Sequence, residues 1–598
     1  MRRLSLLILF ISFSCGSQPA LTTLEPVVVT ATRTKEKTIT PDITVLNSDE
    51  LQAKGITTVE QALRQVSGLS VATTGGPGQL SSIFSRGTES NHTTILIDGV
   101  RMSPGLAGGY DLANLTLDNV ERIEVVKGPI STLYGQDAVG GVINIITSSG
   151  EGERMSGEAS FETGSYSTFQ ELAASRGAFG LFDYSFSASK WVADYHRVND
   201  DIDLFSVRAK LGFRISDTAR LETLINYYKA DNESPGSIPF STPTAELTRE
   251  IFTLAPKLTW QTTPTWKQTV ITSFTQEDQN YMILPVVDNQ TLLQYKTVDY
   301  QSDFQISSSW KLTLGANLEW NQVDLFANHI SAIDESHFSY GFYLQSQWEV
   351  FKNFQMISSL RYDNYQAYDT PITWQQTFSY ELPTDTLLYA KVGTAYSPPT
   401  FQDLYFPGFG NPNLEAEESF SYEIGFTQHF WHKKIRFTSA YFRNEIQNLI
   451  QFDGILPQNI SEAETWGVEN SFTIQPWNFL SLSMGYTYLE ANDTEAQIRL
   501  VRRPRHLFTS DLIVKPLSCV TLFLGAEWKR EREDFDALAF QQKDMPDYLT
   551  LRSGLQWAIN RYCSVGFRVE NLWDEEYEEV SGYPAPRRAY YVKTEFRF

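Results

Sequence analysis

Residues 154–598 alternate apolar and polar side chains along short segments. The pattern is clear in residues 520–528, 564–570 and 590–598. Successive side chains of a strand point to opposite faces, so each segment predicts a β-strand with one apolar and one polar face. The segments are separated alternately by short turns and by long polar stretches, such as residues 529–547.

Two kinds of protein use such strands: soluble β-sandwiches or propellers, and membrane barrels. No repeat of propeller length is present, and a sandwich would bury the charges of the polar faces without partners, which is costly. After residue 14, no apolar run is long enough to cross a bilayer as a helix. The pattern therefore predicts an all-β transmembrane barrel, with apolar faces toward lipid and polar faces toward the lumen.

The length of this region sets the width of the barrel. About 445 residues, at about 20 for each strand with its connection, give about 22 antiparallel strands. A barrel this wide leaves an open pore unless something fills it. Residues 37–153 mix helical spacing at 50–66 with strand patterns at 95–99, 120–127 and 142–147. We expect them to form an N-terminal α+β plug domain in the lumen.

The first residues have the pattern of an export signal. Arg2 and Arg3 precede an apolar core at residues 4–13, and small residues follow it, so we assign residues 1–20 to a signal peptide. Cys15 leaves lipidation open as an alternative. We expect residues 21–36 to be a flexible lead into the plug.

Composition argues against several classes of function. The formal net charge of −23 is unfavourable for binding to nucleic acid. With seven histidines and no nucleophile elbow or metal-binding helix motif, no catalytic group is visible, so we expect no enzyme. An outer-membrane lipase or protease would need a converging Ser, His and acid, which the sequence does not indicate.

Several segments resemble TonB-dependent receptors. Residues 24–33 (LEPVVVTATR) form a β-prone run that can add as a strand to the sheet edge of a partner, and they resemble the TonB box. Arg86-Gly87 and residues 95–101, 120–129 and 140–147 resemble the plug of that family. The resemblance implies TonB-driven import across a Gram-negative outer membrane. By that resemblance, the residues that bind TonB are Glu25, Pro26, Val27, Val28, Val29, Thr30 and Ala31.

The end of the chain indicates how the barrel is inserted. The last strand is apolar on one face and ends in Phe598, which resembles the signal read by the barrel assembly machinery. We therefore expect this machinery and outer-membrane lipid as further partners, and a monomeric receptor.

Residues 78–88 (GQLSSIFSRGT) resemble a ligand-binding plug loop in the cobalamin-transporting branch of the family. The implied ligand is cobalamin or another corrinoid. Backbone and Ser hydroxyl groups suit the amides at the edge of a corrin ring, and apolar side chains suit its faces. By resemblance, the residues that contact the ligand are Leu80, Ser81, Ser82, Ile83, Phe84, Glu89, Ala107, Gly108, Asn232, Arg502 and Phe535.

Two of these positions depart from that branch. Glu89 replaces an Asn, so an acceptor-only carboxylate stands where an amide is expected. Phe535 replaces a Tyr and lacks its hydroxyl. These departures leave the ligand open: ferric siderophore or haem uptake is the alternative in the same fold. A passive porin or adhesin is the alternative of another class, and it would need neither plug nor TonB box.

The same branch uses calcium to order long loops. Carboxylates gather here in two loops that follow each other along the chain, and hard cations bind such oxygen ligands. A solvated acidic rim is the other interpretation. The predicted calcium ligands are Asp194, Asp201, Asp203 and Asp231.

Overall fold

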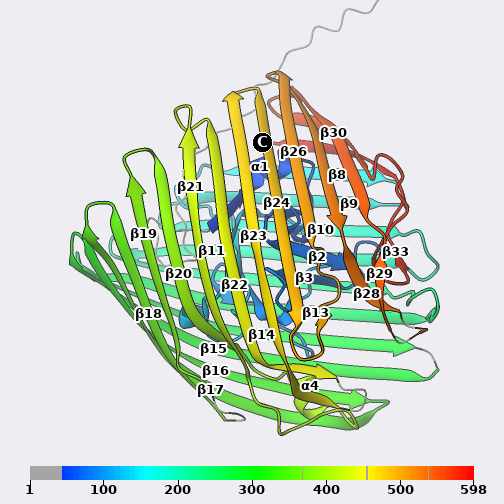
Figure 1. Ribbon diagram of the computed structural model, residues 1–598. Helices are drawn as coiled ribbons and strands as arrows, with labels where there is room; N and C mark the ends of the chain where they lie inside the picture. Colours follow the sequence, from blue (N-terminus) through cyan, green and yellow to red (C-terminus); the bar gives the residue numbers. More distant parts are fainter. Residues whose placement is uncertain are drawn as a thin grey trace, which may run out of the picture.

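The computed structural model describes residues 43–283, 285–366, 368, 370–452, 456–536, 538–539 and 541–598. Figure 1 shows a large barrel of strands around a smaller domain, drawn in blue, that comes from the N-terminal part of the described chain. Within these ranges, no helix is long and apolar enough to cross a membrane.

The wall of the barrel confirms the predicted fold: among the described residues, 22 antiparallel strands close on themselves, and β34 pairs with β8. The two-residue strand β25 (Ile498–Arg499) adds to the edge of β24. The first wall strands are β8 (Ser156–Gly164), β9 (Phe169–Phe179), β10 (Phe182–Asp194), β11 (Asp201–Ser216), β12 (Ala219–Glu233), β13 (Ala245–Thr263), β14 (Trp266–Ile283), β15 (Val287–Ser307), β16 (Trp310–Ala327), β17 (Ile330–Phe351) and β18 (Phe354–Tyr365). The others are β19 (Thr373–Leu382), β20 (Thr386–Ser397), β21 (Glu417–Phe430), β22 (Ile435–Phe452), β23 (Pro457–Trp477), β24 (Leu480–Asp493), β26 (His506–Leu517), β27 (Val520–Arg530), β30 (Tyr548–Asn560), β31 (Cys563–Glu570) and β34 (Ala589–Arg597).

The wall has its apolar side chains outside and its polar side chains inside. On β10, Ser185, Ser187 and Ser189 are buried toward the lumen, while Phe182 and Phe186 are exposed on the outer face. A protein in water has the opposite arrangement, so the outer face is built to contact lipid. The structure therefore confirms the prediction that the apolar faces of the alternating strands point toward lipid and the polar faces toward the lumen.

Short and long connections alternate along the wall, as predicted. Two-residue turns, such as 217–218 and 264–265, join strands at one end. Long connections, such as 234–244, 398–416 and 571–588, lie at the other end. In outer-membrane barrels the long loops face the exterior, so the ligand side of the molecule is the side of these loops.

The plug is an α+β domain around one small sheet. Its elements are β1 (Ile43–Asn47), α1 (Ser48–Ala53), α2 (Val59–Leu63), β2 (Leu69–Thr73), β3 (Ser81–Ser85), η1 (Ser90–His92), β4 (Thr93–Ile97), β5 (Val100–Arg101), β6 (Val120–Lys127), α3 (Ser131–Tyr134) and β7 (Gly141–Thr147). The sheet order is β1-β6-β7-β4-β5, with β4 and β7 parallel. The strands predicted at residues 95–99, 120–127 and 142–147 are β4, β6 and β7.

The helical pattern at residues 50–66 forms two short helices rather than one. Gly55 lies between them with φ +68°, a left-handed conformation that ends α1. The Thr58 hydroxyl accepts a hydrogen bond from the Gln61 amide at 3.2 Å and so begins α2. A side chain at Gly55 would meet the ring of Phe523, 2.5 Å from its Cβ. The wall of the barrel therefore leaves no room for a side chain at this break.

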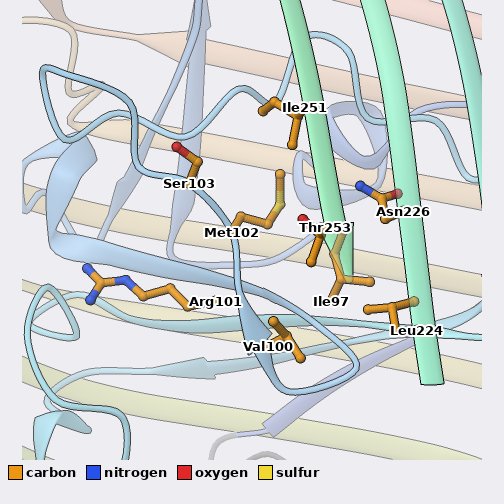
Figure 2. Close-up of a pocket in the computed structure, with 9 residues that line it drawn as sticks. All are labelled: Ile97, Val100, Arg101, Met102, Ser103, Leu224, Asn226, Ile251 and Thr253. Carbon is orange, nitrogen blue, oxygen red and sulfur yellow. The ribbon is translucent and has the colours of Figure 1, made fainter. Parts of the chain in front are cut away.

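Where the plug meets β12 and β13, side chains fill the lumen almost completely. Figure 2 shows Val100 and Met102 of the plug beside Leu224 and Ile251 of the wall. The cavity between them has a volume of about 10 Å³, room for about one water molecule. Plug and wall are therefore closely packed at this contact.

Candidate functional site

The hairpin β2–β3 presents its turn, residues 74–80, next to the ends of wall strands β11 and β12. Asn232 of β12 donates to the carbonyl of Gly78 at 2.9 Å, and Gln79 donates to the carbonyl of Glu233 at 2.7 Å. Gly78 has φ +84°, and a Cβ there would lie 3.0 Å from Ile202 of β11. Close packing on the wall therefore requires glycine at this position.

The predicted contact residues of this hairpin divide into two groups. Leu80 is 66% exposed and Ser82 is half-buried, whereas Ser81, Ile83 and Phe84 are buried. Side chains alternate along β3, so Ile83 turns into the core of the plug while Ser82 turns away from it. In this structure, Leu80 and Ser82 are the side chains of the group that a ligand can reach. Contact with the ligand stays a prediction for all five.

Glu89 pairs with Arg503, a residue that the sequence analysis did not select. The Arg503 Nη2 atom lies 2.7 Å from Glu89 Oε1, and its guanidinium stacks over the Phe84 ring at 4.3 Å. Arg503 also donates from Nε to the carbonyl of Gly87 at 3.2 Å. Burial alone would raise the pKa of Glu89, but the Arg503 charge brings this pKa below its ordinary value. Arg503 belongs to the run Val501-Arg502-Arg503, which resembles the same branch of the family, but only Arg502 of this run is among the predicted contacts.

Residues 104–110 of the plug, which contain the predicted contacts Ala107 and Gly108, form a second loop next to a short helix of the barrel, where the Gln402 amide donates to the carbonyl of Leu106 at 3.1 Å. Helix α4 (Phe401–Tyr405) begins at Thr400 with a capping box to Asp403, and it belongs to connection 398–416. Of the predicted contacts, Ala107 is exposed, and Gly108 is close to Thr400, where an added Cβ would lie 2.8 Å from Cγ2. A recess of about 320 Å³ adjoins α4. Its lining residues are Gln402, Asp403, Phe406, Phe409, Ile450, Gln451 and Pro457.

The three predicted contacts on the barrel differ in accessibility. Asn232 is 6% exposed and acts as a support for the hairpin turn. Arg502 donates to Asp534 at 2.9 Å and keeps about a third of its side chain exposed. Phe535 is 48% exposed on the hairpin formed by β28 (Arg532–Asp536) and β29 (Gln541–Met545).

The four predicted calcium ligands lie at neighbouring strand ends. Asp194 is directly opposite Asp201, and Asp203 is directly opposite Asp231. Lys190 pairs with Asp203, and the Lys229 Nζ lies 3.4 Å from Asp231. Across the residues that the structure describes, no three His, Cys, Asp or Glu side chains gather as a metal site. Calcium binding stays a prediction.

Arg86 ties the plug to the barrel. It is 2% exposed, lies 2.8 Å from Glu423 Oε2 through Nη1, and pairs through Nη2 with Glu469. Lys127 adds a contact of 2.7 Å to Glu469. Arg122 instead pairs within the plug. The plug therefore meets the wall through charged groups as well as through apolar packing.

The TonB box, Glu25 to Ala31, and the signal peptide lie outside the described residues. The barrel and the plug themselves decide the family. The family model for a TonB dependent receptor-like β-barrel matches residues 156–572, and the model for a TonB-dependent receptor plug domain matches residues 35–142. The chain is a TonB-dependent receptor. Members of this family are outer-membrane proteins of Gram-negative bacteria, and this places the receptor in that membrane.

Curated relatives of the receptor match it along nearly its whole length. A protein of Photobacterium profundum, named vitamin B12 transporter BtuB, is 27% identical over 600 residues, covering 96% of this chain and 95% of the relative. A protein of the same name from Vibrio cholerae serotype O1 (strain M66-2) is 26% identical over 610 residues, with the same coverage.

Solved structures share the fold of the receptor. The ferripyoverdine receptor of Pseudomonas aeruginosa superposes with a TM-score of 0.81 at 15% identity, covering 96% of this chain and 88% of that one. The siderophore receptor PiuA from Acinetobacter baumannii superposes with a TM-score of 0.79 at 18% identity, covering 93% and 96%. At these identities the likeness concerns the architecture alone.

Proposed function

We propose that this receptor imports cobalamin or a related corrinoid across the outer membrane, with energy delivered through TonB. The observation that carries the proposal is its similarity to proteins named vitamin B12 transporters over 96% of the chain. The receptor binds and moves its ligand without a chemical step on it.

The accessible side chains of the site suit the chemistry of a corrinoid. A corrin ring is a broad disc with partly apolar faces and amide groups along its edge. Leu80 offers apolar surface, and Ser82 offers a hydroxyl that both donates and accepts. Phe535 and Arg502 are accessible on the loops of the barrel and, in this proposal, contact the far edge of the ring.

TonB engages the receptor through Glu25 to Ala31 in this proposal. The three valines favour an extended strand that pairs with the sheet edge of the partner. Ligand binding would release this segment into the periplasm, and force on it would then rearrange the plug.

Binding titrations separate the corrinoid from a ferric siderophore. Purified receptor is titrated with cyanocobalamin and with a ferric siderophore, each with and without calcium. We expect saturable binding of cyanocobalamin alone. Saturable binding of the siderophore, with none of cyanocobalamin, would overturn the corrinoid assignment and leave TonB-dependent import intact.

We also propose that calcium orders the loops above Asp194, Asp201, Asp203 and Asp231. Like charges directly opposite each other on neighbouring strands repel, and a divalent cation would relieve this repulsion. Lys190 and Lys229 relieve it in part, so the ion would have to displace them.

A further inference from the structure

The last long connection, residues 571–588, folds inward onto the plug. It contains β32 (Glu578–Val580) and β33 (Tyr583–Pro584), which pair antiparallel. Val580 is 4% exposed and packs against Ala72 and Phe84 of the hairpin β2–β3. A loop of the barrel thus covers part of the hairpin whose turn carries Leu80.

One carboxylate of this loop contacts the plug and the wall at once. Glu579 accepts hydrogen bonds from both terminal nitrogens of Arg64, at 2.7 and 2.9 Å. It also accepts from the amide and the hydroxyl of Thr73, at 2.9 and 3.1 Å, and from the hydroxyl of Tyr548 at 2.9 Å. Its side chain is 3% exposed.

The position of Thr73 gives these contacts their significance. Thr73 is the last residue of β2, directly before the turn 74–80, so a bond to its amide fixes the base of the turn. Arg64 follows α2 in the plug, and Tyr548 begins β30 in the wall. Glu579 therefore links the turn, the body of the plug and the barrel through hydrogen bonds. Charge-assisted hydrogen bonds of this kind are stronger than neutral ones.

We propose that Glu579 is a positioning residue for ligand binding, which holds the turn 74–80 at the height where Leu80 and Ser82 meet the ligand. The proposal rests on the function proposed above for what the ligand is. The role of Glu579 in holding the hairpin is independent of that function.

The loop itself has other anchors, so a change at Glu579 tests the carboxylate and leaves the loop attached. The Ser581 amide donates to Asp534 at 2.6 Å, the Ile238 amide donates to the carbonyl of Gly582 at 2.8 Å, and Arg532 donates to the carbonyl of Glu578 at 3.0 Å. These bonds do not involve the carboxylate of Glu579.

The test compares Glu579→Gln with Glu576→Gln in the full receptor. Glu576 lies in the same loop, is 79% exposed and pairs with Arg587, which makes it a matched control. Hydrogen–deuterium exchange is followed in residues 71–84 and in α1, residues 48–53. We expect Glu579→Gln to speed exchange in residues 71–84 about fivefold or more, because local opening becomes easier, and to leave α1 unchanged.

Affinity for cyanocobalamin is measured on the same samples. We expect Glu579→Gln to lower it about tenfold, the loss that follows from one charge-assisted hydrogen bond, and Glu576→Gln to leave it unchanged. Equal exchange in wild type and Glu579→Gln, equal acceleration in α1, or an unchanged affinity would each overturn the proposal. If the wild type binds no cyanocobalamin, the proposed function fails, while the exchange data still decide whether Glu579 holds the hairpin.

Discussion

Ser82 turns away from the plug core because its neighbour Ile83 turns into it. Replacing Ser82 with Trp puts a large ring where the ligand would rest, without disturbing the buried side. We expect Ser82→Trp to weaken cyanocobalamin binding about tenfold or more, since overpacking a contact costs on the order of 1–3 kcal/mol. The measurement is a binding titration of purified receptor.

The matched control is Ser216→Trp, at an exposed position beside the short turn 217–218. It places the same ring at the opposite end of the barrel from the long loops. Unchanged affinity in Ser82→Trp, or an equal loss in the control, would contradict a ligand site at this hairpin.

The pair of Glu89 and Arg503 predicts a dependence on pH. The pKa of Glu89 is lowered in the folded receptor, so the pair stabilises the fold above pH 4.5, the ordinary value, and this contribution is lost as the pH falls through the lowered pKa. We expect the wild type to unfold at a higher temperature than Glu89→Gln at pH 7, and the two midpoints to converge below pH 4.5.

Arg503→Gln provides the complementary measurement, because it leaves the carboxylate of Glu89 without this cation. A gap between wild type and Glu89→Gln that persists unchanged from pH 7 to pH 3.5 would contradict a stabilising ion pair at this site.

Single residues show where sequence reasoning reaches its limit. The resemblance selects residues 80–84 as one block, but alternation along β3 divides them into accessible and buried side chains. Arg503 and Glu579 were not selected because their roles depend on partners far along the chain. Arg503 meets Glu89, and Glu579 meets Thr73, 506 positions away. Contacts between residues so far apart in the chain cannot be predicted from a local sequence pattern.

The elements that the sequence predicts best are the wall strands, whose pattern is set by a single requirement. Strands β27, β31 and β34 follow the expected alternation, since a wall strand between lipid and lumen requires it. The helical segment 50–66 is divided at Gly55, where the backbone is left-handed and the wall leaves no room for a side chain. Helix α4 was not predicted: a helix of five residues inside a long loop has too little periodicity to be noticed.

The proposed calcium site belongs to the scale of the long loops. If it bridges the strand ends at Asp194 to Asp231, a chelator should weaken cyanocobalamin binding, and added calcium should restore it. Asp201→Asn combined with Asp203→Asn should remove the sensitivity to the chelator. An affinity that is the same with and without chelator would refute a role for calcium.

For the whole molecule, the most informative experiment distinguishes ligand binding from ligand transport. Deleting residues 24–32 removes the predicted TonB box and leaves the plug and barrel intact. We expect cyanocobalamin binding to persist and uptake by whole cells to fall to background, because no force reaches the plug.

Val28→Pro gives a finer version of the same test, since proline removes an amide needed for strand pairing. Its control is Thr22→Pro, which lies before the box. Uptake that continues after the deletion would indicate passive entry, as in a porin.

The serines on the inner face of β10 have a consequence for movement of the plug. When the plug shifts, Ser185, Ser187 and Ser189 would become wetted, and water can replace the hydrogen bonds that they lose. Along Ser185 to Ser189, a shift of the plug therefore uncovers hydroxyl groups, whereas Leu224 and Ile251 present apolar surface to it. The plug can therefore move past these serines of the wall at a low cost in free energy, because water takes the place of the lost hydrogen bonds.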